Sequence, residues 1–273
     1  MKKFEGILLC TDLDGTLLGS DRSVSKENLE AIDYFKSNGG RFTFVTGRAP
    51  ITAKRMYEMV HPNAAIGCFN GGGVYDFETD ALLRFKELDR EALELVAAVD
   101  RELPEVGIQV NGARHIYFNK ENAAQEHFRK ITGVPNLSCH FTEVPEPMAK
   151  VLLLHAEDAV IRAVAALLAA HPLASKYDFI RSEPTLYEIL PKGVSKGGAL
   201  LQLAEIYGID PKRTIAVGDY DNDVSMLAAA GLGIAVENAS EAAKRAADLV
   251  TVSNDAHAIA KIINDIDTGR IVL

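Results

Sequence analysis

The sequence predicts an α/β protein with a Rossmann-like, doubly wound parallel sheet as its core and an inserted α+β unit in the middle of the chain. Short apolar runs alternate with helical segments at both ends of the 273 residues. This alternation is typical of a parallel sheet with helices on its faces. Between about Arg84 and Tyr187 it gives way to paired short strands and fewer helices. The middle segment therefore separates two halves of one core.

The first half of the core shows a strand–helix–strand–helix–strand pattern. Residues 6–11 form a short, fully apolar run, as expected for a buried parallel strand. A helix is expected over 25–38, where Gly39 and Gly40 end it. Residues 41–45 and 64–68 predict two more strands, and the third is followed by the loop Asn70-Gly71-Gly72-Gly73.

The second half repeats the alternation. Strands are expected at 214–217, 233–236 and 249–252, and helices at 195–207, 221–230 and 241–247. A closing helix carries Ile259, Ile262, Ile263 and Ile266 at helical spacing. We therefore assign residues 1–84 and 188–273 to the core and residues 85–187 to the insert. Within the insert, Asn111-Gly112 between two short strands is a hairpin signal.

Composition and charge exclude several classes of protein. A formal net charge of −9 argues against a general binder of nucleic acid, which needs an excess of cations on one face. No apolar run approaches the roughly 18 residues of a membrane span, and the apolar stretch at 7–10 is too short for a signal peptide. The cysteines Cys10, Cys68 and Cys139 are odd in number and widely spaced. We expect a cytoplasmic protein with reduced thiols.

The sharpest signal for chemistry is Asp-Leu-Asp-Gly-Thr at 12–16, directly after the first strand. Ligands of parallel sheets bind outside the carboxyl ends of the strands. Asp12 and Asp14 are therefore expected to lie at the ligand-binding edge of the sheet. Two carboxylates so close repel each other unless a cation lies between them. Gly15 allows the chain to turn sharply. The plainer interpretation is a loop in which Asp and Gly merely favour a turn.

A second acidic cluster, Gly-Asp-Tyr-Asp-Asn-Asp at 218–223, also follows an apolar strand. Its oxygen ligands suit a hard cation such as Mg²⁺. Taken alone, it is equally well explained as an acidic cap that complements the dipole of the following helix.

Two weaker signals complete the set. Thr46-Gly47-Arg48 follows the second strand, where a hydroxyl and backbone amides can bind phosphate oxygens. Lys196 lies at the start of a predicted helix, which is unfavourable for a cation unless a carboxylate or phosphate is nearby. Alone, the threonine is a common helix cap and the lysine a solvated side chain.

Together and in this order, Asp12-Leu-Asp-Gly-Thr, Thr46, Lys196 and Gly218-Asp-Tyr-Asp-Asn-Asp resemble the four motifs of the haloacid dehalogenase superfamily. Val-Thr-Gly-Arg at 45–48, Gly-Val-Ser-Lys-Gly at 193–197 and the position of the insert resemble its Cof-type sugar-phosphatase branch. The resemblance covers nearly the whole chain, and it is specific in the core motifs and only general in the insert.

This resemblance implies a magnesium-dependent phosphatase that hydrolyses small phosphorylated metabolites through a phosphoaspartate. Asp12 would be the nucleophile, and Asp14 the general acid and base. Mg²⁺ would bind Asp12, the backbone carbonyl of Asp14 and Asp219, with Asp223 as a further ligand or a support of the site. The residues implied in holding the substrate are Thr46, Gly47, Arg48, Lys196 and Asn222.

The resemblance also implies that the insert is a cap that selects the leaving group. Its polar residues Arg114, His115, Tyr117, Arg181 and Glu188 are candidates, although a structural or solvated role explains each more simply. Two alternatives stay open: a phosphomutase acting on sugar phosphates, and a regulatory protein that binds metabolites with little turnover. A response-regulator receiver is disfavoured because it is much shorter and is phosphorylated on a middle strand. The sequence says nothing about oligomeric state.

Overall fold

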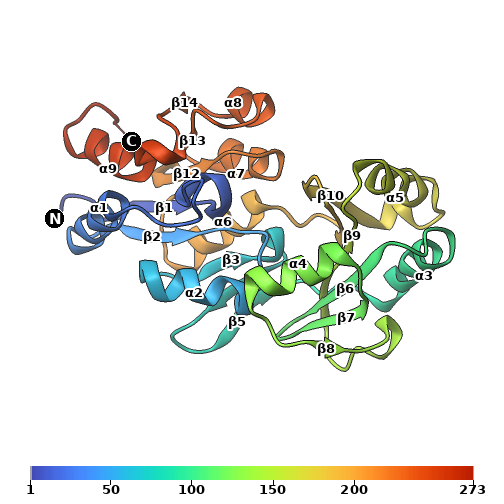
Figure 1. Ribbon diagram of the computed structural model, residues 1–273. Helices are drawn as coiled ribbons and strands as arrows, with labels where there is room; N and C mark the ends of the chain where they lie inside the picture. The colour runs from blue at the N-terminus through green and yellow to red at the C-terminus, as the bar shows by residue number, and fades with distance from the viewer. Residues whose placement is uncertain (1, 273) are drawn as a thin grey trace. The chain divides into compact units, whose positions relative to one another are not determined.

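The computed structural model describes residues 2–272 and contains two compact units (Figure 1). Unit 1 comprises the described residues up to Gly47, Arg55–Arg84 and those from Ser195 onwards. Unit 2 comprises Arg48–Lys54 and Phe85–Val194. Unit 1 holds a five-stranded and a three-stranded sheet and unit 2 a six-stranded one, and the expected mixed α/β architecture with a parallel core sheet is confirmed.

Unit 1 is built on a five-stranded parallel sheet in the order β14-β13-β12-β1-β2. Its strands are β1 (Leu8–Thr11), β2 (Arg41–Phe44), β12 (Thr214–Gly218), β13 (Leu232–Ala235) and β14 (Leu249–Val250). The central strand β1 is wholly buried, which explains its continuous apolar run. The chain leaves β1 for β2 on one side and later fills the other side with β12. This change of direction makes the carboxyl end of β1 the switch point at which ligands bind in such sheets.

A three-stranded antiparallel sheet adjoins β2. It comprises β3 (Ile66–Cys68), β4 (Gly73–Asp76) and β5 (Ala81–Phe85). A single parallel bridge between Val45 and Gly67 links β3 to the end of β2. The predicted third strand is therefore present, but the hairpin of β4 and β5 that follows the Asn70–Gly73 segment was not expected.

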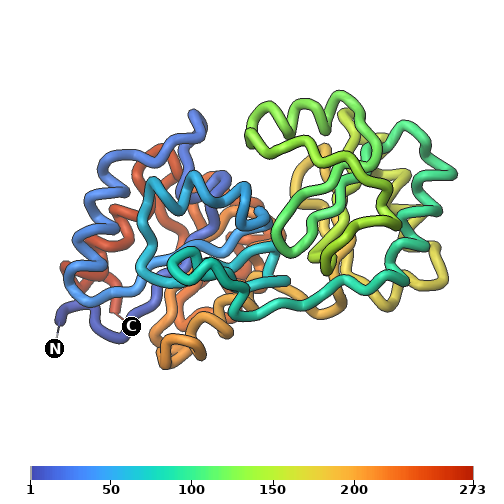
Figure 2. Tube along the Cα trace, turned by 90° about the horizontal axis from the view of Figure 1, so that it is seen from below, coloured from blue at the N-terminus to red at the C-terminus, as the bar shows by residue number. Residues whose placement is uncertain are grey.

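The helices of unit 1 pack against the sheet and against one another. They are α1 (Lys26–Ser37), α2 (Pro50–Val60, whose first residues belong to unit 2), α6 (Lys196–Ile206), α7 (Val224–Ala229), α8 (Glu241–Ala246) and α9 (Ala258–Asp267). Figure 2 shows α1 and α9 side by side. Ser25 caps α1 by accepting a hydrogen bond from the backbone N–H of Asn28, and Ile32 and Phe35 form its buried face.

Unit 2 is a six-stranded sheet in the order β10-β11-β9-β6-β7-β8, antiparallel except between β7 and β8. Its strands are β6 (Gly107–Gly112), β7 (Ile116–Lys120), β8 (Leu137–Ser138), β9 (Met148–Leu154), β10 (Tyr177–Glu183) and β11 (Leu186–Pro191). Its helices are α3 (Leu93–Glu102), α4 (Ala123–Thr132) and α5 (Asp158–Ala170). An apolar cluster joins α3 and α5 to one set of sheet residues, whereas Ala124 and Phe128 of α4 pack against Leu152, Leu154 and Leu186.

Short helical turns connect these elements. In unit 1 they lie at Leu13–Leu17, Phe69–Gly71, Pro211–Arg213, Asp221–Asp223 and Asn254–Ala256, and in unit 2 at Arg90–Ala92, Phe141–Glu143 and Ala174–Lys176.

The hairpin in the insert turns later than expected. Asn111 and Gly112 lie within β6, and the connection to β7 spans 113–115. The reason is burial: Asn111 is 2% exposed, pairs with Lys150 of β9 in register and accepts a hydrogen bond from the Gln109 side chain. Its side chain is therefore an interior polar group, and the Asn-Gly pair is not the turn.

The second boundary of the insert also lies later in the chain. The expected boundary between Tyr187 and Glu188 falls inside β11, whose residues pair with β9 on one side and β10 on the other. Because a strand cannot be divided between two sheets at its hydrogen-bonded middle, unit 2 continues to Val194.

A buried ion pair crosses the unit 2 sheet. Lys150 Nζ of β9 lies 2.5 Å from Glu188 Oε2 of β11, and both side chains are only 3% exposed. Ser182 Oγ donates to the other carboxylate oxygen of Glu188 at 2.5 Å. An unpaired charge is costly in the protein interior. Removing either partner would therefore leave the other as a buried, uncompensated charge.

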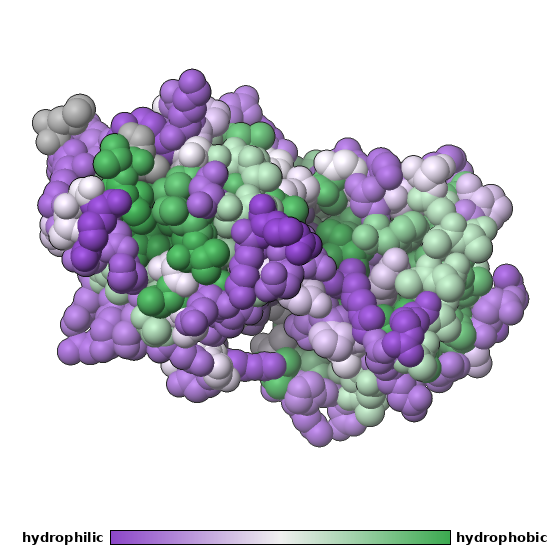
Figure 3. Space-filling model, turned by 90° about the horizontal axis from the view of Figure 1, so that it is seen from above, coloured by the Kyte–Doolittle hydropathy of each residue, from purple (hydrophilic) through white to green (hydrophobic). Residues whose placement is uncertain are grey.

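Surface hydrophobicity is distributed over both units. Figure 3 shows hydrophobic side chains gathered on part of the viewed face of unit 1 among hydrophilic ones. Exposed large apolar residues of unit 1 include Leu249 and Val250 on the short edge strand β14. Among the described residues, no helix has the length and apolar character needed to cross a membrane.

Removing one partner of the buried ion pair should destabilise the protein markedly. We expect Lys150→Met to lower the free energy of unfolding by about 3 kcal/mol or more, because Glu188 would be left buried without its cation. The matched control is Lys130→Met, which breaks an exposed pair with Glu126 and should change stability far less. Urea denaturation measures both, and equal losses would contradict this interpretation.

Candidate active site

The sheet of unit 1 brings the acidic motifs to one edge. Thr11 at the end of β1 is in register with Phe44 of β2 and Val217 of β12. The strands are parallel, so the residues that follow them emerge at the same edge. Asp12, Thr46 and Asp219 follow these three strands.

Asp12 is fixed by its neighbours on the sheet. Its backbone N–H donates to the carbonyl oxygen of Val217 at 2.8 Å, and its side chain is nearly buried. The chain then turns sharply at Gly15, which has a left-handed φ of +83°. A Cβ at Gly15 would lie 2.6 Å from Asp219 Oδ2, so only glycine permits this close approach. Asn238 supports the turn by donating to the Gly15 carbonyl oxygen at 2.8 Å.

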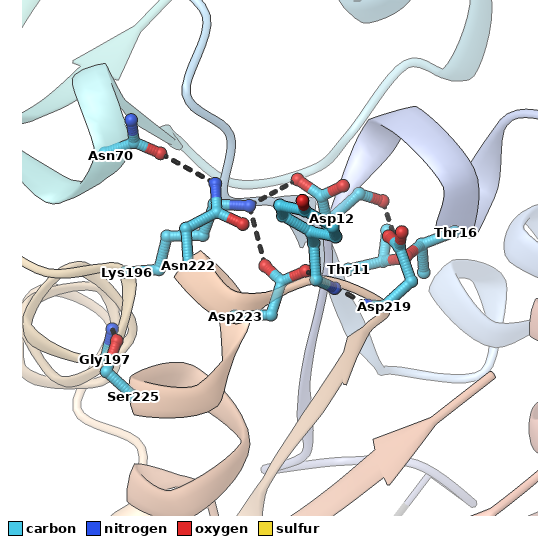
Figure 4. A network of polar contacts seen from close by, with 11 residues as sticks. Thr11, Asp12, Thr16, Asn70, Lys196, Gly197, Asp219, Asn222, Asp223 and Ser225 are labelled. Atoms are coloured by element: carbon cyan, nitrogen blue, oxygen red, sulfur yellow. Dashed lines mark hydrogen bonds and ion pairs between the residues drawn. The ribbon is translucent and has the colours of Figure 1, made fainter. Parts of the chain in front are cut away.

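Lys196 joins two of the acidic segments. Its Nζ lies 2.6 Å from Asp12 Oδ1 and 2.6 Å from Asp223 Oδ1, and the side chain is 2% exposed (Figure 4). It stands at the first position of α6, where Ser195 caps the helix by accepting from Gly198 N–H. The unfavourable position of a cation at a helix start is therefore explained by two carboxylate partners.

Asp223 organises the second acidic loop. Its Oδ2 accepts hydrogen bonds from the backbone N–H groups of Asp219 and Tyr220, each at 3.0 Å, while Oδ1 faces Lys196. Its side chain is completely buried. Asp219 in turn accepts a hydrogen bond from Thr16 Oγ1 at 2.6 Å. The loop and the Asp12 turn are thus locked together.

The site has the composition of a metal centre. Asp12, Asp219 and Asp223 each offer a carboxylate oxygen within 4.8 Å of the others. With Lys196 as their nearby cation, three ionised carboxylates leave an excess of two negative charges. Carboxylate oxygens are hard ligands, and a divalent cation would balance this charge. These residues therefore fit a divalent metal ion.

The pKa values show the same imbalance. Burial raises the pKa of Asp219 to about 6, although the hydrogen bond from Thr16 opposes the shift. Burial also raises the pKa of Asp12 well above its usual range, opposed by Lys196 and reinforced by Asp223, Asp219 and Asp14. Burial alone would lower the pKa of Lys196, but Asp12 and Asp223 raise it overall. The lysine stays charged, and the carboxylates need a further cation to ionise together.

The other expected site residues do not all belong to the unit that carries this cluster. Asp14 is exposed in the turn after Asp12, and Thr46 is buried at the end of β2 beside Gly47. Asn222 donates from its side-chain amide to Asn70 Oδ1 at 3.1 Å. Arg48, in contrast, is grouped with unit 2, and its guanidinium donates to the Thr52 carbonyl oxygen at 3.4 Å.

The candidate residues of the insert have partners within unit 2. Glu188 pairs with Lys150, Arg181 pairs with Asp158, and His115 Nδ1 lies 3.1 Å from Glu146 Oε1. These contacts agree with the structural role that the sequence favoured for them.

Sequence reasoning missed two residues at this site. Thr16 belongs to the Asp12–Thr16 motif and carries no predicted role, yet its hydroxyl donates a hydrogen bond to Asp219. Asn70 was interpreted as part of a loop, yet it is buried and bonded to Asn222. The available signal was the turn-forming Asn-Gly-Gly-Gly run, which indicates an unusual backbone but not its neighbours.

Comparison with known proteins shows the family to which the chain belongs. A model of haloacid dehalogenase-like hydrolases matches residues 9–263. In Bacillus subtilis, 5-amino-6-(5-phospho-D-ribitylamino)uracil phosphatase YwtE is 29% identical over 290 residues, covering 96% of this chain and 98% of that protein. Phosphatase YwpJ of the same organism is 28% identical over 285 residues, covering 94% and 98%.

Solved structures agree with the family match. The crystal structure of a haloacid dehalogenase-like hydrolase from Bacteroides thetaiotaomicron has a TM-score of 0.84 at 26% identity, covering 95% of this chain and 99% of that one. The sugar phosphatase BT4131, at 22% identity, shares the fold with a TM-score of 0.82, covering 97% and 100%. The chain therefore belongs to the haloacid dehalogenase-like hydrolase family and is an enzyme of the hydrolase class.

Proposed function

We propose that this hydrolase is a magnesium-dependent phosphatase that removes phosphate from small phosphorylated metabolites through a phosphoaspartate on Asp12. The observation that carries the proposal is the position of Asp12. It lies at the switch point of the sheet, in contact with Lys196 and within 4.8 Å of two further carboxylates. A buried carboxylate beside a fixed cation is suited to accept a phosphoryl group.

The charge and ligand type of the site support Mg²⁺ as the metal. Asp12, Asp219 and the backbone carbonyl of Asp14 would hold the ion. Asp223 uses both carboxylate oxygens for Lys196 and for backbone N–H groups. It would therefore contribute chiefly by orienting Asp219. When bound, the ion would reduce the repulsion between an anionic nucleophile and an anionic phosphate.

In the first proposed step, a carboxylate oxygen of Asp12 attacks the phosphorus atom and the ester P–O bond breaks. The leaving alkoxide takes a proton from the Asp14 carboxyl group. Asp14 is exposed in the turn after Asp12, so its side chain is accessible to a leaving group. General acid help of this kind contributes typically ~10²–10⁴-fold to the rate.

In the second proposed step, a water molecule attacks the phosphorus of the phosphoaspartate. Asp14, now ionised, takes the proton of that water, and the P–O bond to Asp12 breaks. Inorganic phosphate leaves, and Asp12 and Asp14 return to their starting protonation states. Dividing the displacement in this way replaces one difficult step with two easier ones.

The remaining polar residues would position the phosphoryl group. Lys196 favours the ionised form of Asp12 and so opposes the rise in the Asp12 pKa that burial causes, and its charge would also attract the phosphate oxygens. Thr46, Gly47 and Asn222 would donate hydrogen bonds to those oxygens. Most catalysis of phosphoryl transfer comes from positioning and charge stabilisation of this kind. Arg48 remains a predicted substrate-binding residue.

Unit 2 is proposed to act as the cap that selects the leaving group. The core site recognises phosphate, which all phosphomonoesters share, so discrimination between substrates needs other residues. A relative over nearly the whole chain is named as a phosphatase of 5-amino-6-(5-phospho-D-ribitylamino)uracil, and a fold neighbour as a sugar phosphatase. Phosphorylated sugars and sugar alcohols are therefore the first substrates to assay, in the cytoplasmic setting that the sequence favours.

Replacing the nucleophile should abolish turnover. We expect Asp12→Asn to lose phosphate release from a panel of phosphorylated metabolites, because an amide cannot form the phosphoaspartate. Wild-type release should require Mg²⁺ and stop with excess EDTA. Asp21→Asn, an exposed residue of the same unit, is the control and should behave as the wild type. Equal release by Asp12→Asn would rule out this nucleophile, and no release by the wild type would favour a mutase or a binding protein.

The Gly15 turn should be specifically required for metal binding. We expect Gly15→Ala to weaken the thermal stabilisation given by Mg²⁺, because the added Cβ would displace Asp219. Gly208→Ala is the matched control, since Gly208 also has a positive φ but nothing within 4 Å of its added Cβ. In both variants an alanine must adopt left-handed backbone, which lowers the stability of each. Only the response to Mg²⁺ should therefore differ between them. The same loss of response in both would refute the role of the turn.

A further inference from the structure

The loop after β3 has an unusual backbone that is fully buried. Phe69, Asn70 and Gly71 have successive positive φ values of 55°, 56° and 98°. Phe69 and Asn70 are both 0% exposed. Left-handed backbone is uncommon for asparagine and a true outlier for a bulky aromatic residue. Such strain persists only where the surrounding structure enforces it, and it is concentrated at functional sites.

Asn70 contacts two of the four motifs, the one that contains Thr46 and the one that contains Asn222. Its backbone N–H donates to the Thr46 carbonyl oxygen at 3.1 Å, and its Oδ1 accepts from Asn222 Nδ2 at 3.1 Å (Figure 4). A Cβ added to Gly47 would lie 2.9 Å from Asn70 Oδ1, so the side-chain amide lies directly over that glycine.

The next residue contacts the lysine segment. A Cβ added to Gly71 would lie 2.0 Å from the carbonyl oxygen of Ser195, so the loop backbone abuts the residue before Lys196. One short loop therefore contacts Thr46 and Gly47, the start of α6, and Asn222. These are the segments proposed to hold the phosphoryl oxygens.

We propose that Asn70 is a positioning residue whose side chain aims the Asn222 amide at the phosphoryl group. The proposal rests on the proposed function of Asn222. Its chemistry is simple: Asn70 Oδ1 takes one N–H of the Asn222 amide and so fixes the rotation of that amide. The second N–H of the same group is then directed by the planarity of the amide.

A purely structural role would predict a different pattern of effects. If Asn70 served only to form the turn, glycine would replace it well, because glycine accepts left-handed backbone without strain. Asn70→Gly therefore separates the two roles. It keeps the backbone conformation and removes only the side chain that contacts Asn222 and Gly47.

The test is a double-mutant cycle of Asn70→Gly and Asn222→Ala. The dissociation constant of inorganic phosphate with Mg²⁺ is measured by calorimetry, and KM and kcat with para-nitrophenyl phosphate. We expect Asn70→Gly to weaken phosphate binding on the order of 10-fold without lowering the unfolding temperature, because one charge-assisted hydrogen bond is misdirected. In the Asn222→Ala background the same change should have no further effect, since the residue through which it acts is gone.

The experiment includes a matched control variant and a second variant that disturbs the same contact. His61→Gly removes an exposed side chain from another left-handed residue of unit 1, with φ of 49°, and should leave phosphate binding unchanged. Gly47→Ala keeps Asn70 but pushes its amide aside, and the part of its effect that acts through Asn222 should disappear in the Asn222→Ala background. This route remains available if Asn70→Gly does not fold.

Two outcomes would overturn the proposal. One is unchanged phosphate binding in a folded Asn70→Gly protein, and the other is full addition of the Asn70→Gly and Asn222→Ala losses. Failure of the proposed function gives a distinct result, because the wild type would then release no phosphate at all.

Discussion

The candidate active site depends on one buried cation, Lys196, held between Asp12 and Asp223 at 2.6 Å from each. A lone charge would be prohibitively costly there, so neither the lysine nor its carboxylates can be removed without consequence for the others. The pair of contacts fixes α6 against the ends of β1 and β12. Even with this lysine, the acidic cluster is short of positive charge, so its residues fit a divalent metal ion.

Much of unit 1 could be predicted from the sequence because its signals are local. The apolar run of β1 and the acidic residues after β1 and β12 follow from strand burial and the edge rule of parallel sheets. These signals indicated where Asp12 and Asp219 would meet. The need of Lys196 for an anionic partner was also visible, since a cation at a helix start is unfavourable alone.

What could not be predicted depends on contacts between distant segments. Asn111 carries a strong turn signal, but its burial beside β9 overrides that local preference. The Lys150–Glu188 pair joins two strands through partners 38 positions apart in the chain, and no local pattern indicates it. Asn70 belongs to the same class: its sequence neighbours indicate a turn, whereas its role depends on Thr46 and Asn222, which only the fold brings to it.

The central claim, transfer of the phosphoryl group to Asp12, is tested most directly by trapping the intermediate. Asp14→Asn protein would be mixed with para-nitrophenyl phosphate and Mg²⁺, because this leaving group needs no proton and hydrolysis of the intermediate is slowed. Rapid quenching into borohydride reduces an aspartyl phosphate to homoserine, which peptide mass spectrometry locates. We expect homoserine at position 12 and at no other aspartate. Release of para-nitrophenol without any such modification, or with homoserine at a different aspartate, would contradict it.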